Sequence, residues 1–182
     1  MTELLKGLNI FLVGMMGAGK TTVGKELASK LGYRFFDTDV LIETVASKTI
    51  NEIFADSGEE AFRQLESQVL AEISAYTRLS VATGGGIVMQ RHNWSYLHHG
   101  LIVWLDVPIE VLSDRLALDT TRPLLQQANP ALALQNILEK RQNLYAEADL
   151  HIKVKADETA EEIASRVIAE IPTVLKEFNK KN

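Results

Sequence analysis

A glycine-rich segment that follows a short apolar stretch constrains the fold of this chain more than any other feature. Residues 14–21 read Gly-Met-Met-Gly-Ala-Gly-Lys-Thr, which fits the pattern G-x-x-x-x-G-K-[ST]. The apolar residues 8–13 predict a buried strand before it, and the apolar spacing over 20–31 predicts a helix after it. A glycine turn in that context surrounds an anion with backbone N–H groups, and the helix dipole adds to the attraction. The segment therefore predicts a phosphate-binding loop, with an ordinary glycine turn as the alternative.

Polar side chains near this loop have the chemistry that a nucleoside triphosphate requires. The ammonium group of Lys20 can reach the β- and γ-phosphates, and the hydroxyl of Thr21 can bind Mg²⁺. Asp37 and Asp39 end the second predicted strand, where alternation would point both side chains to the same side. One carboxylate could organise Mg²⁺ through water while the other accepts a hydroxyl proton. The alternative for Asp39 is a helix N-cap before residues 40–46.

Three consecutive glycines, residues 84–86, follow the third predicted strand. Because glycine loses more backbone entropy on folding than other residues, a tight turn alone explains three of them poorly. We expect the backbone to approach a ligand closely at this point. A glycine bulge between a strand and a helix is the structural alternative.

Three arginines are candidate cations for an anionic ligand. Arg63 lies on a predicted helix three residues before Glu66, so an intrahelical ion pair is the alternative. Arg122 lies in the polar segment 119–129, from which an arginine could swing over a nucleotide as a lid does. Arg141 lies near the end of a predicted helix, where compensation of the helix dipole is the alternative.

Five short apolar segments alternate with helical patterns, which predicts one α/β domain with a mostly parallel sheet. The chain of 182 residues carries 19 Lys and Arg against 24 Asp and Glu, a net charge of −5, which disfavours a general nucleic-acid binder. It has no cysteine, which excludes disulfides, thiolate nucleophiles and zinc–thiolate sites. The apolar stretches are too short to span a bilayer, so we expect no membrane association and a cytoplasmic location. A proline at position 172 is expected to interrupt the last helix.

Taken together, these residues resemble the shikimate kinase family of small-molecule kinases, over about residues 8–154. The matching pieces are G-M-M-G-A-G-K-T-T-V-G at 14–24, D-T-D at 37–39, F-R-x-x-E at 62–66, T-G-G-G at 83–86, R-P-L-L at 122–125 and R-x-x-x-Y at 141–145. The order and spacing of the pieces make the resemblance specific. It implies a nucleoside-monophosphate-kinase-like P-loop fold in three layers, with five parallel strands in the order 2-3-1-4-5. The single kinase domain, residues 1–182, would have a substrate-binding region at about 37–66 and a lid at about 119–129.

The resemblance also implies a reaction, in which the γ-phosphate of ATP moves to the 3-hydroxyl of shikimate. The products would be ADP and 3-phosphoshikimate, an intermediate on the way to the aromatic amino acids. The ATP phosphates would be held by Gly17, Ala18, Gly19, Lys20, Thr21 and Thr22, with Arg122 of the lid touching the nucleotide. Mg²⁺ would be bound by Thr21 and supported by Asp37.

The same resemblance implies how the acceptor is held. Asp39 would bond the shikimate hydroxyls and act as the base, alongside Lys20 and Arg63 in the catalytic set. Arg63 and Arg141 would clamp the carboxylate, and Gly85 would contribute a backbone contact. Phe54 and Phe62 would form walls of the pocket. A monomer is the default expectation, with ATP and shikimate as the only partners.

Two other hypotheses fit part of this pattern. A sister kinase such as gluconate kinase would also phosphorylate a hydroxylated carboxylic acid, but the combined D-T-D, F-R-x-x-E and R-P-L-L pieces argue against it. A nucleotide-dependent binding module without catalysis would have no need for Asp39, Arg63 and Arg141, the residues of an acceptor site.

Overall fold

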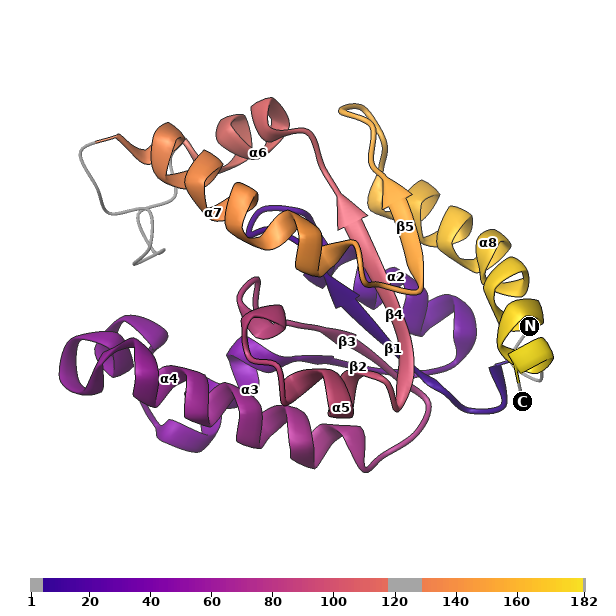
Figure 1. The fold of residues 1–182 in the computed structure, drawn as a ribbon, viewed down its shortest axis with the longest axis horizontal. Coiled ribbons are helices and arrows are strands. Elements are labelled where there is room, and N and C mark those ends of the chain that lie inside the picture. Colours follow the sequence, from indigo (N-terminus) through magenta and orange to yellow (C-terminus); the bar gives the residue numbers. More distant parts are fainter. Residues whose placement is uncertain (1–4, 118–128, 182) are drawn as a thin grey trace.

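The computed structural model describes residues 5–117 and 129–181, and its centre is a parallel β-sheet (Figure 1). The sheet has five strands in the order β2-β3-β1-β4-β5, and every neighbouring pair is parallel. The strands are β1 (Asn9–Val13), β2 (Arg34–Asp37), β3 (Leu79–Ala82), β4 (Gly100–Asp106) and β5 (Leu150–Lys153). The predicted fold class and strand order are therefore confirmed.

Helices cover both faces of this sheet (Figure 1). The connection from β1 leads toward the β2 edge of the sheet, whereas every later connection leads toward the β5 edge. Because such connections are right-handed, α2 lies on one face of the sheet and the later crossover helices lie on the other. The C-terminal α8 packs beside α2. The helices are α2 (Lys20–Leu31), α3 (Thr38–Ala46), α4 (Ile50–Ser74), the 3₁₀ helix η1 (Ile87–Met89), α5 (Asn93–Leu97), α6 (Ile109–Leu116), α7 (Pro130–Tyr145) and α8 (Ala160–Lys181).

The central strand of the sheet, β1, lies within the core, and the predicted phosphate-binding loop follows directly after it. All five residues of the central strand β1 are buried, as expected for a parallel strand covered on both faces. The connection that follows β1 runs one way along the sheet, and the connections that follow its neighbours β3 and β4 run the other way, so β1 lies at a topological switch point. Ligands bind beyond the carboxyl ends of strands at such a point. A ligand site is therefore expected at the segments that follow β1, β2 and β3.

Two details of the helices bear on the sequence-based predictions. The helix predicted to carry Arg63 is α4, and its Gly58 has φ 81° and ψ 175°, so the helix is broken at that residue. The prediction that Pro172 interrupts the last helix is wrong, because α8 continues through it. Buried residues on both sides of the proline, Val167 and Leu175 among them, anchor α8, and this packing offsets the cost of about 3 kcal/mol for an internal proline.

Neither the predicted lid, apart from Asn129, nor Arg122 lies within the described residues. Asn129 caps α7 through its side chain, which accepts a hydrogen bond from the backbone N–H of Leu132. Of the described helices, none has the length and apolar character needed to cross a membrane.

Candidate active site

The segment after β1 forms a loop that ends at the first residue of α2. Gly17 and Gly19 have φ values of 77° and 87°, in the left-handed region that glycine adopts without strain. A side chain at Gly17 would also meet Leu116, whose Cγ lies 3.1 Å from the position of a Cβ. The ammonium group of Lys20 donates hydrogen bonds of 2.8 Å to the carbonyls of Gly14 and Met15. The lysine thus lies over the loop whose N–H groups and helix dipole favour an anion.

Thr21 and Asp37 bring two oxygen ligands together beside this loop. The hydroxyl of Thr21 donates to Oδ2 of Asp37 at 2.7 Å. A hydroxyl and a carboxylate in contact suit Mg²⁺, which takes oxygen ligands and keeps waters and substrate phosphates as the rest of its shell. The described residues contain no cluster of three or more acidic or histidine side chains that could hold a metal by themselves. The pair therefore fits an ion that arrives with a polyphosphate better than a permanently bound one.

The two aspartates differ from the prediction in their local structure. The expectation that both end a strand and point to one side is wrong, because β2 ends at Asp37 and Asp39 lies in the first turn of α3. Asp37 is the N-cap of α3, and its Oδ1 accepts from the backbone N–H of Asp39 at 3.0 Å. The N-cap alternative for Asp39 is therefore also wrong. Capping leaves Oδ2 of Asp37 directed at Thr21, and the helical turn presents Asp39 to the loop after β3.

Each glycine of residues 84–86 makes room for a charged side chain. A Cβ on Gly84 would lie 2.5 Å from Oε1 of Glu66 and 3.0 Å from Oδ1 of Asp39. A Cβ on Gly86 would lie only 2.3 Å from Nη1 of Arg63. At Gly85 the nearest atoms, all at 3.4 Å, include Nη1 of Arg141 and two backbone atoms of the phosphate loop. The three glycines therefore allow a close approach to the backbone, as expected, but the groups that approach it are side chains of the protein itself rather than a ligand.

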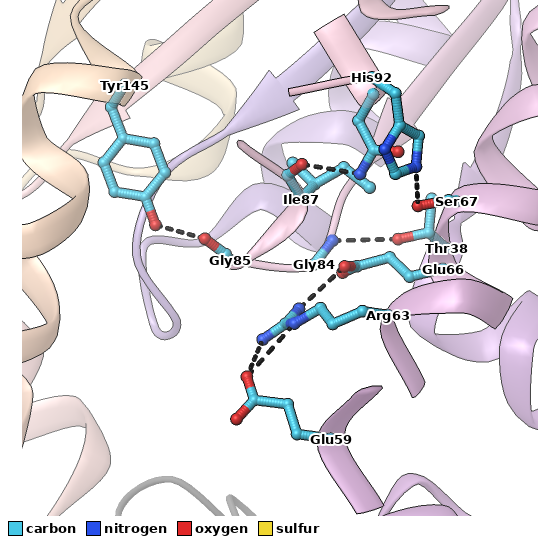
Figure 2. Close-up of polar contacts among 11 residues, drawn as sticks. Thr38, Glu59, Arg63, Glu66, Ser67, Gly84, Gly85, Ile87, His92 and Tyr145 are labelled. Carbon is cyan, nitrogen blue, oxygen red and sulfur yellow. Dashed lines mark hydrogen bonds and ion pairs between the residues drawn. The ribbon is translucent and has the colours of Figure 1, made fainter. Parts of the chain in front are cut away.

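Arg63 and Glu66 form a buried ion pair against this glycine loop (Figure 2). Nη1 of Arg63 donates to Oε2 of Glu66 at 2.8 Å, and Nε and Nη2 donate to Glu59 at 3.3 and 3.0 Å. The predicted intrahelical pair thus exists, although only 8% of Arg63 and none of Glu66 is exposed. Burial raises the pKa of Glu66, and the charge of Arg63 opposes this rise. The second oxygen of Glu66, Oε1, has no hydrogen-bond partner within the described residues.

Arg141 reaches the same loop from the opposite side, on α7. It is 6% exposed, so the alternative of a surface arginine that compensates a helix dipole does not fit. Its helix also contributes Tyr145, whose hydroxyl donates to the carbonyl of Gly85 at 2.5 Å (Figure 2). Two arginines from separate helices therefore converge on three consecutive glycines.

One cavity of about 780 Å³ joins these groups. Its lining includes the phosphate loop, Asp37, Asp39, Arg63, Glu66, Arg141 and residues 83–86, together with both predicted wall residues, Phe54 and Phe62. These two rings pack with centroids 4.9 Å apart. Of the site residues predicted from the sequence, all except Arg122 therefore lie on this cavity.

Sequence reasoning missed three residues at the site. Arg115 of α6 lines the cavity and donates to the carbonyl of Gly17 at 3.0 Å, but an arginine in an amphipathic helix gives no sequence signal. The sequence predicts Glu66 only as an ion-pair partner of Arg63, and it predicts no role for Tyr145. Their position in the F-R-x-x-E and R-x-x-x-Y pieces was the available signal.

The fold and the site define a class: a P-loop kinase with a cavity beside its phosphate loop, in which two buried arginines converge. Comparison with known proteins gives the family. The shikimate kinase family model matches residues 16–172, and the curated shikimate kinase of a Nostoc species is 60% identical over 177 residues, covering 97% of this chain and 98% of the relative. The chain belongs to the shikimate kinase family.

Solved structures agree with this assignment. The chain superposes on the shikimate kinase from Acinetobacter baumannii in complex with shikimate with a TM-score of 0.90 and 39% identity, covering 95% of this chain and 98% of that one. A gluconokinase from Sinorhizobium meliloti superposes with a TM-score of 0.57 and 16% identity, over 97% of this chain and 98% of that one. The second likeness shows a shared fold and nothing more.

Proposed function

We propose that this protein is a shikimate kinase, which transfers the γ-phosphate of ATP to the 3-hydroxyl of shikimate and releases ADP and 3-phosphoshikimate. The single observation that carries the proposal is the convergence of Arg63 and Arg141 on residues 84–86, within the cavity that also contains the phosphate loop. Two buried guanidinium groups suit a carboxylate, which they can bind with paired hydrogen bonds. An acid held there has its hydroxyls close to a nucleotide on Lys20.

The placement of the site residues supports a role for each of them in this reaction. Residues 17–22 bind the ATP phosphates through backbone N–H groups and the N-terminus of α2, and Lys20 neutralises the charge that develops on the transferred group. Asp39 lies in the first turn of α3, beside Gly84 and Glu66, where it can accept a proton from the acceptor hydroxyl. Gly85 offers a backbone contact between the two arginines. Arg122 is proposed to act on the nucleotide from the lid, on sequence grounds alone.

Mg²⁺ enters this proposal as the ion that accompanies ATP. Thr21 and Asp37 would hold it, because their oxygens touch at 2.7 Å beside the phosphate loop. The ion would neutralise charge on the β- and γ-phosphates. Capping of α3 by Asp37 fixes the orientation of that carboxylate before any ligand binds.

A coupled assay of ADP release tests the function directly. We expect turnover with ATP, Mg²⁺ and shikimate, and none with gluconate or without an acceptor. A matched Asp39→Asn variant should bind ATP but turn over very slowly, which controls for contaminating kinases. Turnover with gluconate but not with shikimate would overturn the proposal, and absence of turnover with either acid would favour a binding module. Monomeric state, cytoplasmic location, a single-domain chain and the absence of nucleic-acid partners stay predictions from the sequence.

A further inference from the structure

The hydroxyl of Tyr145 lies where three parts of the active site meet. It donates to the carbonyl of Gly85 at 2.5 Å, which is the middle glycine of the loop after β3. It also lies 3.8 Å from the sulfur of Met15, within the phosphate loop. Tyr145 itself ends α7, one helical turn after Arg141. Residues four apart on a helix share a face, so the tyrosine and the arginine approach the glycine loop together.

The tyrosine is held rigidly and as a hydrogen-bond donor. None of its surface is exposed, and its ring stacks on Trp104 of β4 with centroids 5.9 Å apart and an interplanar angle of 30°. Burial raises its pKa, an effect that the neighbouring charge of Arg141 partly offsets. The phenol is therefore neutral at physiological pH and keeps the proton that it donates to Gly85. Figure 2 shows it on the side of the glycine loop opposite Arg63 and Glu66.

The glycine loop needs such a restraint. Glycine leaves the backbone more conformations than any other residue, so three in a row are not held by their own side chains. On one side the N–H of Gly84 donates to the hydroxyl of Thr38 at 3.0 Å. On the other side, the carbonyl of Gly85 accepts a hydrogen bond from the hydroxyl of Tyr145. The carbonyls of Gly84 and Gly86 accept backbone hydrogen bonds from Ile87 and Met89. The bonds to Thr38 and Tyr145 tie the loop to α3 and α7.

We propose that Tyr145 is a positioning residue for the acid acceptor, which acts by fixing the Gly85 peptide against α7 so that Gly85 and Arg141 face the same carboxylate. The proposal rests on the proposed function and deepens it, because it concerns the shikimate subsite of the same cavity. Tyr145 touches neither substrate in this account. Its effect passes through Gly85 and Arg141, because the sulfur of Met15, 3.8 Å away, is too weak an acceptor for loss of that contact to alter the nucleotide subsite.

The test replaces the tyrosine with phenylalanine, which removes only the hydroxyl. For Tyr145→Phe we expect the KM for shikimate to rise about tenfold, as for loss of one aligned hydrogen bond, with kcat and the KM for ATP within about twofold. The matched control is Tyr33→Phe. Tyr33 is also buried, its hydroxyl has no hydrogen-bond partner within the described residues, and it precedes β2 at the edge of the sheet remote from the glycine loop. Tyr33→Phe should change none of the three constants.

Two outcomes would overturn the proposal. One is a shikimate KM within twofold of the wild type, and the other is a loss spread equally over kcat and both KM values, as a general packing defect would give. If the wild type itself does not turn over shikimate, the proposed function fails, and amide hydrogen exchange then decides the role of Tyr145. Faster exchange confined to residues 83–87 in Tyr145→Phe supports positioning of the loop, and unchanged exchange there refutes it.

Discussion

Substitution of Gly86 by alanine should disable the acceptor subsite through a single methyl group. The new Cβ would lie 2.3 Å from Nη1 of Arg63, so the guanidinium must retreat by about 1 Å to regain ordinary contact. Glu66 and Glu59 hold that guanidinium, and Arg63 borders the open cavity, so a retreat moves the guanidinium away from the glycine loop and strains these ion pairs. Loss of an aligned, charge-assisted contact costs about 1.5–3 kcal/mol, which corresponds to about a 10- to 140-fold rise in the KM for shikimate.

The assay is coupled ADP release with shikimate and ATP varied separately. The KM for ATP should stay within twofold, because the substitution leaves the phosphate loop alone. Gly32→Ala is the matched control: φ there is 67° and no atom lies within 4 Å of the added Cβ, so it should cost about 1–2 kcal/mol of stability and no affinity. If Gly86→Ala stays folded and binds shikimate with an unchanged KM, Arg63 does not hold the acid at this loop, and the reasoning is refuted.

Four further predictions address the other groups of the site. Asp39→Asn should lower kcat by about 10²- to 10⁴-fold with ATP affinity retained in an equilibrium titration, and undiminished turnover would exclude Asp39 as the base. Arg141→Ala should raise the KM for shikimate or abolish its binding by calorimetry; an unchanged affinity would place the carboxylate elsewhere. Asp37→Asn should raise the Mg²⁺ concentration needed for half-maximal rate, and an unaltered Mg²⁺ dependence would argue against its role. Burial raises the pKa of Glu66, so the folded protein holds the carboxyl proton of Glu66 more tightly than the unfolded chain does. As the pH rises above the ordinary glutamate range, the unfolding free energy of the wild type should therefore decline relative to that of Glu66→Gln. Parallel pH profiles in chemical denaturation would contradict this.

The α/β fold and the phosphate loop could be predicted from the sequence because their signals are local. Strand β1 is apolar throughout, and the glycines and Lys20 follow it at fixed spacing, so the strand, loop and helix can be predicted from consecutive residues. The errors arose where local rules competed. Asp37 and Asp39 are both good capping residues, and which one caps α3 depends on where β2 stops pairing with β3. Pro172 is a helix breaker by itself, but burial of α8 on both sides of it decides otherwise.

The sequence by itself therefore determined the strand–loop–helix unit, the alternation of strands and helices, and the chemical types available for a site. Only the tertiary structure decided which charges meet. Arg63 and Arg141 are 78 positions apart in the sequence, yet the strand order brings α4 and α7 to the two sides of residues 84–86. The physical reason is that spacing along the chain reports only contacts within one element. Burial, pKa shifts and the room left by a missing Cβ arise instead from the packing of several elements on one sheet.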